Sequence, residues 1–148
     1  MTDDGVRVAE SESERADAMA VRIAVFVEGQ GVPEEKERDG KDDEAIHFVA
    51  YDDERAIGAA RLRPIGGDEA KVERVAVREP RRGEGWGRRL MTAVEDAARE
   101  RDRPDLVLYA QTHVEGFYAD LGYETTSEEF EEAGIPHVEM RKRLDPQE

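Results

Sequence analysis

The chain has no cysteine, only four lysines among its 148 residues, and no long apolar run. The absence of cysteine excludes a thiol nucleophile, a cysteine-ligated metal site and a disulfide scaffold. No run of apolar residues approaches the roughly 20 that a membrane-spanning helix needs. The first residues, Met-Thr-Asp-Asp-Gly, have neither the basic nor the apolar stretch of a signal peptide. We therefore expect a soluble, cytoplasmic protein.

Basic side chains are also scarce relative to acidic ones. The chain has 22 Lys and Arg against 37 Asp and Glu, a formal charge of -15, and its pI is near 4.7. Binding to the phosphate backbone of a nucleic acid needs a basic surface that displaces counterions. Anionic membrane surfaces likewise attract basic segments. The charge therefore argues against nucleic acids and membranes as partners.

Arginine accounts for 18 of the 22 basic residues. An acidic chain that is rich in Arg and poor in Lys is typical of proteins that work in a high-salt cytoplasm. At molar salt the Debye length is about 3 Å, so the mutual repulsion of surface acids is largely screened. A halophilic source is one interpretation. The other is an ordinary acidic protein from a GC-rich genome, in which Arg codons replace Lys codons.

The apolar pattern predicts one mixed α/β domain over residues 1–148, with its core at about 5–145. Strands are expected at residues 6–9, 45–51, 56–63, 71–77, 106–110, 123–126 and 137–144. Helices are expected after a capping box at Ser11–Glu14, after Pro80, and around residues 114–121, where Gly122 can end the helix in the left-handed conformation. Gly29 and Gly31 should end the first helix. Residues 28–44 and the acidic stretch before residue 137 are expected to be irregular, the former as loop or broken helix.

Three glycines at alternate positions, Gly83, Gly85 and Gly87, join a strand that ends at Val77 to a helix. Unpaired amides at a helix N-terminus attract anions, and glycine lets the backbone approach a phosphate closely. Residues 74–89 contain six Arg and two Glu, a local charge of +4 in a chain of -15. A P-loop would have Lys after its last glycine, and a Rossmann turn would have a glycine at Leu90. The turn therefore predicts another kind of anion site, unless the glycines serve the connection alone.

The run Arg82–Gly87 (Arg-Gly-Glu-Gly-Trp-Gly) resembles the Arg/Gln-x-x-Gly-x-Gly/Ala signature of the GNAT family of N-acetyltransferases. Residues 73–77 are similar to the strand that holds the thioester in that family, and residues 110–123 to the second half of its cofactor site. The ending Gly134–Met140 resembles the ElaA-like branch. The segments agree with the family in order and spacing, and the resemblance covers essentially the whole chain.

The resemblance implies a GNAT-type mixed sheet of six to seven strands flanked by helices, whose central parallel strands, residues 72–77 and 106–110, splay apart. It also implies acetyl-CoA as cosubstrate, with the pantetheine arm between these strands and a backbone amide near Val75 polarising the thioester. The cofactor-binding residues so implied are the backbones of Val75, Ala76 and Val77, the pyrophosphate group Arg82, Gly83, Gly85, Gly87 and the weaker candidate Arg88, and also Gln111 and Phe117. The side chains of Val75 and Val77 should pack in the core at the same time.

The implied reaction is direct attack of an amine on the thioester in a ternary complex, because the chain has no cysteine and no recognisable Ser–His arrangement. Tyr118 resembles the family's general acid, although it also falls on the apolar face of its helix. Glu73 resembles the strand carboxylate that acts as base through water, although any one of 37 carboxylates is more often solvated. His137 or His113 could relay the proton instead. His47 is expected in the core, and no spacing of His and carboxylates resembles a metal site.

Two acidic loops indicate which kind of acceptor the protein takes. Residues 28–44 contain eight acids and three bases, and residues 124–132 contain five acids and no base. In the family these loops border the acceptor, so they predict a small cationic amine; salt adaptation of the whole surface is the other explanation. A homodimer is left open. The fold could also serve a non-catalytic acyl-CoA-binding regulatory module, or an interaction protein that does not bind CoA.

We expect the midpoint of thermal unfolding to rise with KCl concentration, because salt screens the repulsion among the excess acids. Scanning calorimetry from low to multimolar KCl measures this midpoint. A protein that is as stable at low salt as at multimolar salt would contradict the halophilic source.

Overall fold

The computed structural model describes residues 5–37 and 40–144. The ends of the predicted domain (1–4 and 145–148) and residues 38–39 of the predicted loop lie outside the described residues. The helices are α1 (Glu12–Arg22), the π-helix η1 (Ile23–Glu28), α2 (Glu34–Glu37), α3 (Trp86–Glu100) and α4 (Glu115–Asp120), with 3-10 turns η2 (Asp42–Glu44), η3 (Glu79–Arg81) and η4 (Thr112–Val114). The strands are β1 (Gly5–Val8), β2 (Ile46–Asp52), β3 (Arg55–Pro64), β4 (Glu69–Val77), β5 (Asp105–Gln111), β6 (Glu124–Thr125), β7 (Phe130–Glu132) and β8 (Ile135–Arg143).

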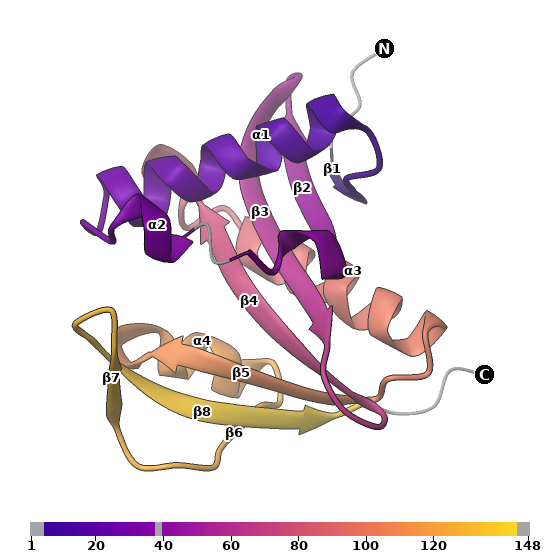
Figure 1. Ribbon diagram of the computed structural model, residues 1–148, viewed down its shortest axis with the longest axis vertical. Coiled ribbons are helices and arrows are strands. Elements are labelled where there is room, and N and C mark those ends of the chain that lie inside the picture. Colours follow the sequence, from indigo (N-terminus) through magenta and orange to yellow (C-terminus); the bar gives the residue numbers. More distant parts are fainter. Residues whose placement is uncertain (1–4, 38–39, 145–148) are drawn as a thin grey trace.

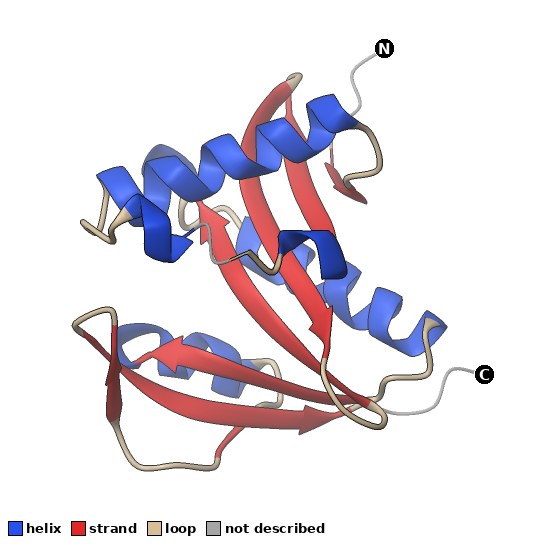
Figure 2. Ribbon diagram, in the orientation of Figure 1, coloured by secondary structure: helices blue, strands red, loops and turns tan. Residues whose placement is uncertain are grey.

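The eight strands in the described part of the chain form one mixed sheet in the order β1-β2-β3-β4-β5-β8-β6, with β7 also paired to β8. Helices α1 and α2 lie on one face of this sheet, and α3 and α4 lie on the other (Figures 1 and 2). The predicted mixed α/β class is confirmed. The predicted number of six to seven strands is too low, because Phe130–Glu132 in the acidic stretch forms β7. Its two glutamates hide this strand from a hydrophobic pattern, and only its pairing with β8 reveals it.

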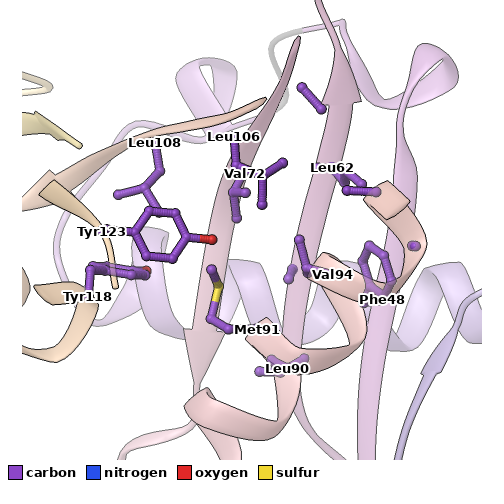
Figure 3. Close-up of a cluster of buried hydrophobic side chains, with 14 of the residues drawn as sticks. Phe48, Leu62, Val72, Leu90, Met91, Val94, Leu106, Leu108, Tyr118 and Tyr123 are labelled. Atoms are coloured by element: carbon purple, nitrogen blue, oxygen red, sulfur yellow. The ribbon is translucent and has the colours of Figure 1, made fainter. Parts of the chain in front are cut away.

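Helix α3 packs against the sheet through the apolar stripe that the sequence predicted. All five residues of that stripe are buried: Trp86, Leu90, Met91, Val94 and Ala98. In the same cluster, Figure 3 shows Leu90, Met91 and Val94 beside the sheet residues Phe48, Leu62 and Val72. Burial of each large apolar side chain contributes about 1.5–3 kcal/mol. The cluster therefore fixes α3, and with it the glycine turn at its start, against the sheet.

β4 and β5 are parallel neighbours that pair over only part of their length. The pairing runs from Glu69 with Asp105 to Val72 with Leu108, whereas β4 continues to Val77 and β5 to Gln111. Beyond the last pair the two strands diverge (Figure 1). The predicted splay of the central parallel strands is confirmed. It leaves the main-chain groups on the facing edges of β4 and β5 without each other as partners.

A β-bulge in β4 lies where the strands part. Between the pairs Ala59–Ala76 and Arg61–Glu73, β4 has two intervening residues and β3 has one. One of the two, Arg74, has a left-handed backbone with φ of 58°. This conformation is uncommon for any residue other than glycine, and an extra residue of this kind bends a strand and strengthens its local twist.

The bulge also exchanges the two faces of β4. Before it, Val72 packs in the cluster beneath α3; after it, Val75 and Val77 pack against the same cluster. An unbroken alternation would have turned Val75 and Val77 toward α1 instead. The expectation that both side chains pack in the core is confirmed, and the bulge is the physical reason that they do so on the α3 side.

Helix α1 begins at the predicted capping box. The Ser11 hydroxyl accepts a hydrogen bond from the Glu14 amide, and the Glu14 carboxylate accepts one from the Ser11 amide. The helix then widens into η1, in which the Gly29 amide donates to the Ala24 carbonyl five residues back. Gly29 ends η1 as predicted. No helix within residues 5–37 and 40–144 is long and apolar enough to cross a membrane.

Replacing Gly29 with alanine should destabilise the fold. Its backbone is right-handed, with φ of -81° and ψ of -38°, so alanine would by itself stabilise a helix here by roughly 0.5–1 kcal/mol. A Cβ at this position, however, would lie 2.6 Å from the Val25 carbonyl oxygen. We expect Gly29→Ala to lower the free energy of unfolding by about 1–3 kcal/mol in a urea titration. Gly66→Ala is the control, since a Cβ there meets no atom within 4 Å; equal effects of the two variants would contradict the steric argument.

Candidate active site

The diverging ends of β4 and β5 border a cleft of about 1110 Å³. All residues predicted to bind the cofactor line it: Val75, Ala76, Val77, Arg82, Gly83, Gly85, Gly87, Arg88, Gln111 and Phe117. The catalytic candidates line it as well: Tyr118, Glu73, His137 and His113. These residues come from four separate segments of the chain, and the splay of the two strands is what makes room for one cavity among them.

The three glycines of this turn are required for two different physical reasons. Gly83 and Gly85 have left-handed backbones, with φ of 83° and 88°, which glycine adopts without steric cost. Gly87 is needed for space, because a Cβ there would lie 3.1 Å from the ring of Phe117. Gly85 is the N-cap of α3, and no side chain of the described residues caps this helix start. The first amides of α3 are therefore available to an anion.

The arginines around this turn divide into two groups. Arg81 is held by the carboxylates of Asp52 and Glu84, and the Arg89 guanidinium lies 4.2 Å from the Trp86 ring centroid. Arg82 and Arg88 are exposed and line the cleft; Arg82 Nε donates to the Val77 carbonyl at 3.0 Å. The first group fixes the turn, and the second presents its charge to the cavity.

Tyr118 is a buried residue that also lines the cleft. The residue is 8% exposed, and its ring packs edge-on against Phe117 at a centroid distance of 5.0 Å. It also packs edge-on against Tyr123 at 6.0 Å, and Figure 3 shows these two tyrosines side by side. Burial raises the pKa of Tyr118 well above its ordinary value, so the hydroxyl is protonated at neutral pH. Within the described residues the structure contains no hydrogen bond to this hydroxyl. Tyr118 is therefore part of the core and part of the cleft lining at once.

The Glu73 carboxylate is held by three cations. Its side chain is 9% exposed; Oε1 lies 2.9 Å from Arg61 Nη2 and 3.0 Å from Arg63 Nε, and Oε2 lies 3.6 Å from Lys71 Nζ. Burial by itself would raise the pKa of Glu73. The hydrogen bond from Arg63 and the charges of Arg61 and Lys71 outweigh that effect and lower the pKa below its usual value. Glu73 is therefore ionised at neutral pH and is a weaker base than an ordinary carboxylate.

Arg61 links Glu73 to a second carboxylate inside the fold. Arg61 and Arg22 are fully buried, and each donates to Asp42 Oδ1 at 2.9 Å. Burial raises the pKa of Asp42, but the hydrogen bonds and charges of the two arginines lower it further than burial raises it. His47 is buried as predicted, with Nε2 2.8 Å from the Asp42 carbonyl oxygen. The chain Arg22–Asp42–Arg61–Glu73, which we call the buried ion chain, joins α1, η2, β3 and β4.

His137 is a buried histidine on β8. Its Nδ1 lies 2.7 Å from the Ile135 carbonyl oxygen, and its ring stacks on Phe130 at a centroid distance of 6.1 Å. A carbonyl oxygen can only accept, so Nδ1 bears the proton of the neutral ring and Nε2 holds the lone pair. The residue therefore has one nitrogen that can take up a proton.

Gln111 is held by neighbours from two sides. It exchanges hydrogen bonds of 2.9 and 3.2 Å with Gln30, in the loop after η1, and His113 Nε2 lies 2.7 Å from its Oε1. The exchange connects the end of β5 to the segment that follows the first helix. Gln30 was not predicted from the sequence, because nothing local indicates that these distant segments meet.

Three further lining residues were also missed: Lys71, Arg74 and Tyr109. Tyr109 is 39% exposed, Lys71 Nζ lies 3.7 Å from its ring centroid, and Phe130 packs edge-on against it at 5.1 Å. Lys71 lies two positions before Glu73 and so shares its face of β4, which is a signal that the sequence did contain. The position of Tyr109 depends on the pairing of β4 with β5, which the sequence pattern does not reveal.

Few acids of the two acidic loops reach the cleft. The described lining residues from 28–44 are Gln30, Val32 and Lys41, and from 124–132 the lining includes Glu132. Among the residues that the structure describes, the electrostatic argument for a cationic acceptor therefore depends on Glu132.

A splayed pair of parallel strands beside a glycine turn at a helix start defines the acyl-CoA-dependent transferase class that the sequence predicted. A family model described as an acetyltransferase (GNAT) domain matches residues 8–144. The chain belongs to the GNAT family, and it is an acetyl-CoA-dependent N-acetyltransferase of that family.

Known relatives agree with this assignment. The uncharacterised N-acetyltransferase YjcF of Bacillus subtilis is 42% identical over 136 residues, which cover 91% of this chain and 96% of YjcF. ElaA of Escherichia coli is 31% identical over 132 residues, 85% of each chain. The crystal structure of Escherichia coli ElaA matches with a TM-score of 0.83 and 26% identity, over 93% of this chain and 98% of that one. An acyl-CoA N-acyltransferase from Pseudomonas aeruginosa matches with a TM-score of 0.81 and 26% identity, over 93% and 96%. The predicted ElaA-like branch is thereby confirmed.

Replacing Glu73 with glutamine should destabilise the protein at neutral pH, because it removes one of the two carboxylates that hold the buried Arg61. Breaking a buried pair of this kind costs about 3–5 kcal/mol. The folded-state pKa of Glu73 lies below the reference value of 4.5, so its contribution is present above that value and is lost as the pH falls through the folded-state pKa. The stability difference between wild type and Glu73→Gln should be largest near neutral pH and should shrink in acid.

Urea titrations across the acid range measure this difference. Glu100→Gln is the control, since the Glu100 side chain is 66% exposed and its loss should change stability by less than about 0.5 kcal/mol. A Glu73→Gln effect that is independent of pH would show that the carboxylate charge is not its cause.

Proposed function

We propose that the protein moves an acetyl group from acetyl-CoA to a primary amine by direct attack of that amine in a ternary complex. The observation that supports this most strongly is Tyr118, a protonated hydroxyl that lines the same cleft as the bulge in β4 and the glycine turn. The cleft volume of about 1110 Å³ exceeds the roughly 300–1,000 Å³ of a site for one small molecule. This favours a cavity for a cofactor arm and an acceptor together.

The residues present fit the two chemical halves of acetyl-CoA. The facing edges of β4 beyond Val72 and of β5 beyond Leu108 do not pair with each other, and their main-chain groups suit the amides of a pantetheine arm. The uncapped start of α3, with Arg82 and Arg88 beside it, suits the pyrophosphate. When bound, acetyl-CoA supplies a thioester carbonyl as the electrophile. An aminoglycoside 6'-N-acetyltransferase of similar fold, with a TM-score of 0.78 and 16% identity, was solved in complex with coenzyme A.

Two groups of this chain would assist the breaking of the carbon–sulfur bond of the thioester. The amine nitrogen forms a bond to the thioester carbon, and the carbon–sulfur bond breaks with its electron pair on sulfur. The Val75 amide, next to the bulge, would stabilise the negative charge that develops on the carbonyl oxygen. The Tyr118 hydroxyl would donate its proton to the departing sulfur, and burial of its ring keeps that proton in place at neutral pH.

The amine must lose a proton before or during its attack. Of the three candidate bases, His137 suits this task best, because the contact of its Nδ1 with the Ile135 carbonyl leaves Nε2 of the neutral ring with a lone pair. Glu73 is the weaker candidate, since three cations lower its pKa; it would act through a water molecule. His113 is exposed and shares Gln111 with Gln30, which supports a role in positioning the loops.

We propose that the acceptor is cationic, as the acidic loops predicted. A primary amine arrives as an ammonium ion, and Glu132 at the cleft would attract it. We also propose a cytoplasmic, high-salt setting, which the excess of surface acids supports. A panel of amines with acetyl-CoA tests the acceptor, and a preference for anionic or neutral acceptors would count against the electrostatic attraction.

The role of Tyr118 is tested by Tyr118→Phe. We expect kcat with a good amine to fall by about 10²–10⁴, while the Kd for acetyl-CoA by calorimetry stays within about twofold. Tyr123→Phe is the matched control: it removes the hydroxyl of the neighbouring buried ring, which donates to Glu95 at 3.0 Å and is not among the lining residues. Unchanged turnover in Tyr118→Phe would contradict the general-acid role.

Measurements of CoA binding and of turnover also distinguish the enzyme from the two alternatives, a regulatory module and an interaction protein that does not bind CoA. Gly85→Val should abolish CoA binding, because valine is strained at φ of 88° and disturbs the start of α3. Gly67→Val places valine at another position of positive φ, 55°, in a turn outside the cleft and should leave binding intact. A wild-type protein that binds CoA but acetylates no amine would be a regulatory module, and one that does not bind CoA would be an interaction protein.

A further inference from the structure

Cationic side chains gather at two places in the cleft. Six cationic side chains and two carboxylates line it, in a chain whose formal charge is -15. Half of these cations belong to the glycine turn: Arg82 and Arg88, which suit the pyrophosphate of CoA, and Arg81, which the carboxylates of Asp52 and Glu84 hold. The other half, which we call the acceptor-side cations, are Lys41, Lys71 and Arg74. The pyrophosphate of the proposed cofactor does not account for this second group.

Two of the acceptor-side cations, Lys71 and Arg74, are too far along β4 to serve the pyrophosphate. Lys71 and Arg74 precede the stretch Val75–Val77, which borders the proposed pantetheine arm and spans about 10 Å at strand spacing. Lys71 alternates with Val72, which packs beneath α3, so Lys71 lies on the opposite face of the sheet, the face that α1 covers. These cations therefore border the part of the cleft beyond the thioester, where an acceptor enters.

Lys71 is incompletely neutralised by its neighbours. Its ammonium lies 3.7 Å from the Tyr109 ring centroid and 3.6 Å from Glu73 Oε2. Glu73, however, also serves Arg61 and Arg63. Burial lowers the pKa of Lys71; the charges of Glu73 and Glu132 oppose this, Arg63 adds to it, and the net direction is downward. An additional anion would compensate a charge that the protein holds half-buried.

Arg74 supplies an independent observation. It has a left-handed backbone at φ of 58° and lines the cleft, at a position where glycine would be less strained. Strained backbone at a cleft is typical of functional positions.

Apolar side chains complete this part of the cleft. Val25 and Phe26 come from η1, Val32 from the loop after it, and Ile135 from β8. Tyr109 is exposed and contacts Lys71 through its ring. The π-helix contributes two of these residues, which agrees with the frequent occurrence of π-helical segments at functional sites. An acceptor that suits such a surface has an apolar part as well as charged groups.

We propose that the acceptor is a primary amine that also carries a carboxylate, and that Lys71 and Arg74 bind this carboxylate while the apolar part of the molecule lies on Tyr109 and Phe26. Amino acids with apolar side chains are the simplest members of this class. The inference rests on the proposed function and deepens it. It keeps the primary amine of the proposed function and replaces the net cationic acceptor expected from the acidic loops with a zwitterion, so a preference for zwitterions would count against attraction by Glu132 as the main determinant.

The test compares amines that differ in one group. Matched pairs are phenylalanine with phenethylamine, leucine with isopentylamine, and lysine with its decarboxylated diamine, and kcat/KM is measured from the release of CoA. We expect the best carboxylate-bearing member to exceed its decarboxylated partner at least tenfold. O-phosphoethanolamine against ethanolamine distinguishes the anion: if the phosphate compound is the best acceptor of the panel, the carboxylate class is wrong.

Variants of Lys71 test whether this side chain causes the preference for carboxylate-bearing acceptors. Lys71→Gln should raise KM for the carboxylate-bearing acceptor at least tenfold and change that for the decarboxylated partner by less than twofold, while Lys71→Arg should keep the preference. Lys142→Gln is the matched control: Lys142 also lies near a carboxylate and a tyrosine ring, 3.2 Å from Glu95 Oε1 and 5.5 Å from the Tyr123 centroid, but it is not among the lining residues. Thermal midpoints of all three variants verify that each one folds.

Binding is measured apart from turnover, by calorimetric titration of the CoA-saturated protein with each acceptor. Binding of a carboxylate-bearing amine that Lys71→Gln weakens, without acetylation of any amine, would support the inference and overturn the proposed function. Turnover that prefers the decarboxylated amines, or a preference that survives in Lys71→Gln, would overturn the inference and leave the proposed function intact. Neither binding nor turnover would overturn both.

Discussion

Two parallel strands that pair over four residues and then part set the arrangement of this site. The bulge at Arg74 lies where β4 leaves β5, and it turns Val75 and Val77 into the core beneath α3. Before the bulge, Glu73 and Lys71 alternate with Val72 and so lie on the face that α1 covers. This one irregularity in the pairing of β4 accounts for the cavity, for the unpaired strand edges and for the separation between a cofactor side and an acceptor side. A regular parallel pair would have closed the gap with hydrogen bonds.

The charged side chains of this protein lie in three different environments. The acids in excess are mostly exposed, where salt screens them. The buried ion chain Arg22–Asp42–Arg61–Glu73 balances its charges internally, and it ties the first helix to the strand that bends. The cations that line the cleft are the third group, and they exceed the carboxylates beside them. A net charge of -15 is therefore an average over a screened surface, a neutral interior and a positive cavity.

Local signals predicted the elements that depend on neighbours along the chain. The capping box at Ser11, the buried stripe of α3 and the left-handed Gly122, with φ of 99°, all occur as expected. The elements that the sequence did not predict are the π-helix η1, the bulge at Arg74 and the short strand β7. Each of these is weak or strained as an isolated segment, and it persists because the surrounding structure stabilises it.

The sequence by itself determined the cofactor half of the cleft, since a strand, three glycines, two cleft-lining arginines and a helix start lie within a few turns of chain and act through their own backbone. It also determined the family and the candidate acid Tyr118. Only the tertiary structure decided which charges meet. Lys71 contacts Tyr109 through the pairing of β4 with β5, and Glu73 reaches Asp42 through Arg61. Contacts between residues far apart along the chain depend on strand register and on burial, and neither is encoded in any one local pattern.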